Sequence, residues 1–134
     1  MKYNVYIDWD NANKIKNEKS LLKRISYFLQ KTKECNILKE NIEIKEISYR
    51  LSSIKGIHLR ITVEMDDIIF KEEDTFLLLI LMFRAVWKDD SERIRIDLER
   101  YAKYSDISKT NRIFDIKVRN GKKYCASEWV KVER

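Results

Sequence analysis

Two separate segments of this chain alternate strictly between apolar and polar residues, and this pattern limits the possible folds more than any other feature. Residues 3–10 and residues 57–65 both have an apolar side chain at every odd position. Successive side chains of a strand point to opposite faces of a sheet, so this period of two predicts strands with one buried and one open face. The fold must therefore contain a sheet with its core on one side.

Helices of different character are predicted to supply that core. Residues 19–34 have an apolar stripe at helical spacing with lysines around it, which predicts an amphipathic helix. Residues 73–88 are apolar almost all round and follow acidic residues suited to a helix N-terminus, which predicts a buried helix. Whether this helix also contributes to a dimer interface stays open. Residues 42–52 predict another strand, with a bulge near Glu46–Ile47.

The last third of the chain gives less uniform signals. In residues 93–99 Ile94, Ile96 and Leu98 alternate with charged residues, which favours a strand, although a helix beginning near Leu98 is an alternative. Residues 112–119 and 122–133 predict a hairpin, because Asn120-Gly121 is the pair that a two-residue type I′ turn favours. The resulting order, β-α-β-β-α-β-(α)-β-β, predicts one α+β domain over 1–134, with helices on one face of a mostly antiparallel sheet.

Composition narrows the classes of function. Lys and Arg total 28 against 22 Asp and Glu, giving a net charge of +6, and this suggests a polyanionic partner. The chain has no Pro and only two Gly, which excludes a Walker A loop and a GxGxxG fingerprint. Cys35 and Cys125, with a single His, cannot form an ordinary zinc site. We interpret them as reduced thiols of a cytoplasmic protein without a signal peptide.

Two further compositional signals bear on surroundings and origin. The longest apolar run, residues 76–83, is too short to cross a bilayer, so no membrane partner is predicted. Lys, Glu and Ile are frequent. This composition fits a thermophile, and it equally fits an AT-rich genome.

The polar faces of the predicted strands contain a set of residues suited to chemistry. Asp8 and Asp10 share a face of the first strand, about 7 Å apart at their Cα atoms. His58 and Arg60 share a face of the second, and Asp97 lies in the segment favoured as a third. If these strands are neighbours, three carboxylates converge beside an imidazole and a guanidinium.

Such a set predicts a metal-dependent nucleotidyl-transfer site. Three carboxylates suit two divalent cations such as Mg²⁺, which prefer oxygen ligands and also take substrate phosphates. His58 and Arg60 would bind the phosphates of a nucleotide, with Lys55 nearby. Gly56 would let the backbone approach the phosphates closely.

Three short motifs occur in order along the chain. They are Val5-Tyr6-Ile7-Asp8-Trp9-Asp10, then Ser52-Ser53-Ile54-Lys55-Gly56-Ile57-His58-Leu59-Arg60, then Ile96-Asp97. Together they resemble the motifs of the archaeo-eukaryotic primase superfamily, which includes the primase-polymerases of viruses and plasmids. They span residues 5–97, and the second is the most specific.

The resemblance implies an RRM-like catalytic sheet and a minimal primase-polymerase that extends nucleic acid during DNA replication, of the kind found in archaeal viruses or plasmids. It implies that Asp8, Asp10 and Asp97 bind Mg²⁺ or Mn²⁺. It also implies that four further residues contact the incoming NTP or dNTP, namely Ser53, Lys55, His58 and Arg60. The implied partners are a single-stranded template or a primer-template; a homodimer or a replication partner protein stays open.

Two other classes of function remain as alternatives. The segment Tyr6-Ile7-Asp8-Trp9-Asp10-Asn11 is also similar to the opening of NYN/PIN-type ribonucleases, whose fold is a parallel sheet. A non-catalytic nucleic-acid-binding module is the second alternative, because a sheet of this kind can stack bases on aromatic side chains. Rolling-circle endonuclease chemistry is disfavoured, since it needs a His-hydrophobe-His motif and the chain has one His.

Overall fold

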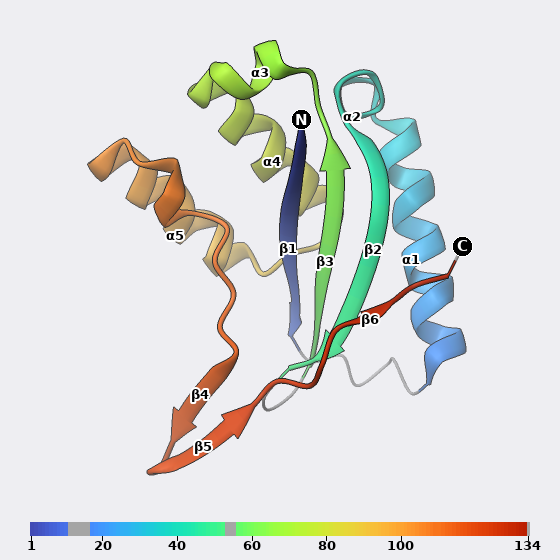
Figure 1. The fold of residues 1–134 in the computed structure, drawn as a ribbon, viewed down its shortest axis with the longest axis vertical. Coiled ribbons are helices and arrows are strands. Elements are labelled where there is room, and N and C mark those ends of the chain that lie inside the picture. Colours follow the sequence, from blue (N-terminus) through green and yellow to red (C-terminus); the bar gives the residue numbers. More distant parts are fainter. Residues whose placement is uncertain (11–16, 53–55, 134) are drawn as a thin grey trace.

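The computed structural model describes residues 1–10, 17–52 and 56–133, and it contains an antiparallel sheet with helices on one face (Figure 1). The sheet has four strands in the order β1-β3-β2-β6. These strands are β1 (Lys2–Asp10), β2 (Glu43–Leu51), β3 (Gly56–Glu64) and β6 (Val130–Lys131). A separate hairpin is formed by β4 (Ile116–Arg119) and β5 (Lys122–Cys125).

Helices account for most of the remaining residues. They are α1 (Glu18–Glu34), α2 (Asn36–Asn41), α3 (Asp67–Lys71), α4 (Glu73–Val86), α5 (Ser91–Tyr104) and the short 3₁₀ helix η2 (Ile107–Lys109). In Figure 1, α4 lies behind the sheet, α1 lies along its β2 side, α5 lies beyond the β1 edge, and the C-terminal segment crosses in front of β2. The predicted α+β class, with an RRM-like antiparallel sheet, is confirmed. In the described part of the chain, no helix combines the length and apolar character needed to cross a bilayer.

The register of the sheet brings the two alternating segments together. β3 pairs antiparallel with both β1 and β2. The odd-numbered residues of β1 and β3 face the core, where all but the partly buried Tyr3 are buried, as their period predicts. The even-numbered residues therefore share the opposite face, which we call the open face, where Asp8 lies opposite His58 and Tyr6 opposite Arg60. The predicted irregularity in β2 is present as a register shift between Ile44 and Glu46.

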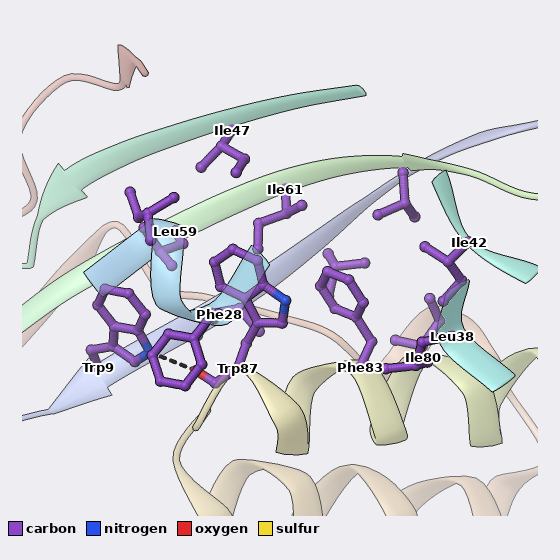
Figure 2. Packing of buried hydrophobic residues seen from close by; sticks show 14 of the residues in the cluster. Trp9, Phe28, Leu38, Ile42, Ile47, Leu59, Ile61, Ile80, Phe83 and Trp87 are labelled. Atoms are coloured by element: carbon purple, nitrogen blue, oxygen red, sulfur yellow. Dashed lines mark hydrogen bonds between the residues drawn. The ribbon is translucent and has the colours of Figure 1, made fainter. Parts of the chain in front are cut away.

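An aromatic group ties the end of β1 to two helices. Trp9 packs against Phe28 of α1, and Phe28 packs against Trp87 at the end of α4 (Figure 2). The indole N–H of Trp9 donates to the Trp87 carbonyl oxygen at 2.7 Å, and the Trp87 indole N–H donates to Thr32 Oγ1 at 2.9 Å. Buried Trp needs a partner for its N–H, and these two bonds link the C-terminal part of β1 to Trp87 and α1.

The prediction of a strand over residues 93–99 is wrong, because these residues lie within helix α5. Asp90 caps the helix by accepting from the Glu92 N–H, and Arg95 pairs with Glu92 and Glu99 at helical spacing. A cap and i,i+3 and i,i+4 ion pairs favour a helix. The alternation of Ile94, Ile96 and Leu98 is therefore not a strand period.

Side chains bind the edge of β1 where a third polar strand was expected. The Asn111 side chain accepts from the Tyr6 N–H at 2.9 Å and donates to the Asn4 carbonyl at 2.7 Å. Arg93 donates to the Tyr6 carbonyl, and Asp89 accepts from the Asp8 N–H at 2.8 Å. Backbone groups at a sheet edge need partners, and here side chains satisfy them without a strand.

The predicted hairpin is confirmed, in a shorter form. Asn120 and Gly121 both have positive φ, 53° and 75°, as a type I′ turn requires. The hairpin of β4 and β5 ends at residue 125. Residues 130–131 instead join the main sheet beside β2. Residues 53–55, between β2 and β3, lie outside the described residues.

Candidate active site

The C-terminal end of β1 places two aspartates on the open face. Trp9 is buried in the core, so its neighbours Asp8 and Asp10 point the other way. Asp10 lies opposite Gly56 of β3, which has φ +126°. A Cβ on Gly56 would lie 2.4 Å from the Trp9 carbonyl oxygen. The glycine therefore allows β3 to approach β1 closely, which differs from the predicted approach to phosphates.

A third aspartate joins them from the start of α5. Asp90 donates its backbone N–H to the Asp8 carbonyl oxygen at 3.2 Å. The neighbouring Asp89 side chain holds both backbones in place, since its Oδ1 accepts from the Asp8 and the Asp90 N–H, each at 2.8 Å. One buried carboxylate thus positions two residues of the site.

Asp8, Asp10 and Asp90 form the carboxylate cluster. One oxygen from each lies within 4.8 Å of the other two. The Asp8 side chain is only 13% exposed, and its buried Oδ1 has no hydrogen-bond partner among the described residues. A buried polar oxygen without a partner is costly, and a bound cation would satisfy it.

Asp8 and Asp10 of the carboxylate cluster have raised pKa values. Burial, together with the charge of Asp10, raises the pKa of Asp8 to about 6, against the opposing effect of Arg93. Burial also raises the pKa of Asp10, and a hydrogen bond and charge from the Asp90 carboxyl add to the effect. Like charges that share a site disfavour full ionisation, so a cation would compete with protons here.

His58 stands beside the carboxylate cluster as a neutral ring with a defined tautomer. Its Nδ1 accepts from Arg50 Nε at 3.0 Å, so the proton of the neutral ring is on Nε2. Burial and the nearby Arg50 guanidinium lower the pKa of His58 to about 4. Nε2 lies 3.7 Å from Asp8 Oδ1. The lowered pKa of His58 keeps its ring neutral at physiological pH, so its contact with Asp8 is not an ion pair.

The carboxylate cluster opens into a cleft with basic walls. The cleft has a volume of about 220 Å³ and lies between the end of β1, α5 and the start of the β4–β5 hairpin. Its cationic lining residues are Arg93, Arg100, Arg112 and Lys117, and His58 also lines it. Carboxylates and cations that line one cleft suit a metal-bound phosphate ligand.

The structure separates the predicted site residues. Asp8, Asp10 and His58 come together in the cleft as predicted. Arg60 does not line it, because its guanidinium stacks on Trp129 at 4.8 Å from the ring centre. Ser53 and Lys55 lie outside the described residues.

Asp97, predicted on a strand as the third metal ligand, has a different environment. It is buried on α5, where its Oδ2 accepts from Arg84 Nη1 and from the Asn111 N–H. It lines the same cleft, but the carboxylate cluster found among the described residues contains Asp90 in its place. The predicted strand is a helix, so the third carboxylate that lies beside Asp8 and Asp10 is that of Asp90.

Sequence reasoning missed Asp89 and Asp90. The available signal was Asp90-Ser91-Glu92, an acidic cap residue followed by an acidic first turn. Recognising it starts a helix at Ser91 and places both aspartates just before that helix. Their approach to β1 depends on long-range packing, which the local pattern does not contain.

Comparisons with protein-family models, with curated proteins and with solved structures find no match for this chain. Its function is therefore inferred from the chemistry of the cleft and from the motifs in the sequence.

Proposed function

We propose that this chain is a minimal primase-polymerase-like domain that performs metal-dependent nucleotidyl transfer on nucleic acid during DNA replication. The observation that supports it most is the carboxylate cluster of Asp8, Asp10 and Asp90 in a cleft that cationic residues also line. The resemblance of the first two motifs to the primase superfamily supports the same function. The free thiols Cys35 and Cys125 suit a cytoplasmic protein.

The residues of the carboxylate cluster fit a divalent cation. All three ligands are hard oxygens, the kind that Mg²⁺ and Mn²⁺ take, and the buried Asp8 Oδ1 lacks another partner among the described residues. Asp8, Asp10 and Asp90 would hold the metal. Bound there, it would activate an attacking hydroxyl and stabilise charge on a leaving pyrophosphate.

Other residues of the cleft would orient the nucleotide. Arg93 and Lys117 lie close enough to lower the pKa of Asp8, so they can also neutralise a bound triphosphate. His58 presents its Nε2–H beside Asp8, held in that tautomer by Arg50. A fixed donor aimed at a phosphate oxygen contributes preorganised electrostatic stabilisation.

The alternative of an NYN/PIN-like nuclease uses similar carboxylate chemistry. The parallel sheet of that family differs from the antiparallel pairing of β1 with β3 and of β3 with β2, which weighs against it. The primase-like function therefore ranks first.

The test is an extension assay with Mn²⁺, labelled nucleotides and a single-stranded template, with and without a primer. The matched control is Asp8→Asn/Asp10→Asn, which removes charge and keeps the side-chain shapes. Longer products that the control lacks support the proposal. A template shortened only by the unsubstituted protein would favour the nuclease, and no metal-dependent product of either kind would overturn both.

His58 separates the two chemistries further. His58→Asn places an amide near the Nδ1 position and removes the Nε2–H. We expect it to weaken binding of the nucleotide while the carboxylate cluster keeps its affinity for Mn²⁺. Unchanged nucleotide affinity, measured with a labelled NTP, would contradict the role given to His58.

A further inference from the structure

The β4–β5 hairpin has a face that is suited to a polyanion. Its register pairs Lys117 with Tyr124 and Arg119 with Lys122. Alternate residues of a strand share a face, so Lys117, Arg119, Lys122 and Tyr124 form one surface, which we call the ribbon face. It has three cations and one aromatic ring, and the hairpin extends away from the main sheet (Figure 1).

The cations of the ribbon face lie at the surface of the protein. Lys117, Arg119 and Lys122 are exposed, and none of them forms an ion pair within the described residues. Arg119 and Lys122 are direct cross-strand neighbours, and like charges in that position destabilise a hairpin. A bound anion with repeated charges would relieve this repulsion.

The ribbon face also continues into the cleft. Lys117 lines the cleft beside Asp8, Asp10 and Phe114, while Arg119 and Lys122 lie farther along the hairpin, next to its turn. A ligand that follows these cations therefore leads toward the carboxylate cluster. A chain of phosphates matches this linear arrangement of charges.

Tyr124 indicates which kind of polyanion fits. The Lys122 ammonium lies over its ring, 5.6 Å from the ring centre. Surfaces that bind single strands combine cations along the backbone with aromatic rings on which bases stack. Bases in a duplex are already stacked on each other, so an aromatic ring of this kind selects unpaired bases.

We propose that the ribbon face binds the backbone of a single-stranded nucleic acid and guides it toward the cleft. Arg119 and Lys122 contact phosphates, and Tyr124 stacks on a base. This inference rests on the proposed function for the direction of the strand, whereas binding itself requires no catalysis.

The experiment measures binding of a fluorescein-labelled single-stranded oligonucleotide of mixed sequence, in EDTA, by anisotropy across a series of salt concentrations. The test variant is Arg119→Gln/Lys122→Gln. The matched control is Lys19→Gln/Lys23→Gln, which removes the same charge from exposed positions of α1, on the other side of the sheet. Circular dichroism and gel filtration check that both variants keep the fold and association state of the original protein.

Each phosphate contact to a single strand contributes about 0.7 to the slope of log K against log salt, so the ribbon variant should have a slope shallower by about 1.4. The control should keep the original slope. Equal slopes and affinities for the two variants would overturn the proposal. Tyr124→Leu provides a second measurement: it should weaken single-strand binding roughly fivefold or more without changing the slope, and equal weakening for a duplex would also contradict the inference.

The outcomes separate this inference from the proposed function. The binding assay contains no metal and no nucleotide, and the extension assay depends on Asp8 and Asp10. A failed extension assay with a clear ribbon effect would leave a single-strand-binding module. Extension without a ribbon effect would leave the proposed function and remove this surface from it.

Discussion

Two neighbouring groups of aspartates lie where the start of α5 meets the end of β1, and the protein stabilises their charges in opposite ways. Asp89 and Asp97 are buried and share the guanidinium of Arg84, which bonds to Asp89 at 2.6 Å. The carboxylate cluster of Asp8, Asp10 and Asp90 has no such shared cation at its centre in the described chain. Arg93 also pairs with Asp89, so the protein itself neutralises the first group. The second group is left for protons or a cation.

The difference teaches which carboxylates are structural. Arg84 belongs to the apolar helix α4 and is completely buried. The cost of burying its charge is offset by the two carboxylates that contact it. Asp89, positioned by Arg84, accepts hydrogen bonds from the backbone N–H groups of Asp8 and Asp90 and so positions both residues. The neutralised group thus supports the geometry of the group that is not neutralised.

The largest effect should come from removing the shared cation. Arg84→Leu leaves Asp89 and Asp97 buried without it, and breaking a buried ion pair in this way costs about 3–5 kcal/mol. Urea unfolding at neutral pH measures the loss of unfolding free energy. A variant as stable as the original would mean that Arg84 does not neutralise these carboxylates, and the comparison would fail.

Removing a charge from the carboxylate cluster should have the opposite sign. The pKa of Asp8 is raised from 3.8 to about 6, so the folded state keeps this proton while the unfolded state loses it as pH rises. The penalty is absent below pH 3.8, grows between the two values, and is complete above pH 6. Asp8→Asn removes it.

We therefore expect Asp8→Asn to stabilise the metal-free protein at pH 7.5 by on the order of 2–3 kcal/mol, at 1.36 kcal/mol for each pKa unit. Near pH 4 the gain should be small. The measurement is urea unfolding in EDTA at both pH values. A gain of the same size at both would show that a cause other than ionisation stabilises the variant.

A divalent cation should do for the carboxylate cluster what Arg84 does for Asp89 and Asp97. At a hundredfold excess over its dissociation constant, a ligand specific for the folded state adds about 2.7 kcal/mol. Millimolar Mn²⁺ should therefore clearly raise the melting temperature of the original protein and leave that of Asp8→Asn/Asp10→Asn unchanged. An unchanged melting temperature in the original protein would count against a metal site.

The part of this arrangement that could be predicted from sequence is the part that depends on local period. The alternation of residues 3–10 and 57–65 predicted both strands and put Asp8, Asp10 and His58 on one face, which the register confirms. The turn at Asn120-Gly121 was equally local. Each of these features is determined by residues that are close together in the sequence.

The third carboxylate could not be predicted in this way. Residues 93–99 satisfy the strand period by chance over a few positions, while the cap at Asp90 and the ion pairs of Arg95 favour the helix. A shift from strand to helix changed which aspartate faces Asp8. The bonds of Asp89 to two distant backbones depend on tertiary packing, which no local pattern contains.

The smallest effect distinguishes the two candidates for that third carboxylate. Asp97→Asn keeps an oxygen for the Asn111 N–H and loses the charge opposite Arg84, so we expect a stability loss on the order of 1–2 kcal/mol. The rise in melting temperature with Mn²⁺ should persist, because Asp97 is outside the carboxylate cluster.

The matched variant is Asp90→Asn, since Asn caps a helix about as well as Asp. It should retain the stability of α5 and lose much of the Mn²⁺ response. The reverse result, a response that survives Asp90→Asn and disappears with Asp97→Asn, would return the metal to the ligand that the primase-like motif implies. It would also mean that α5 turns Asp97 toward Asp8 when a cation binds, so that Arg84 would have to be left with Asp89 alone.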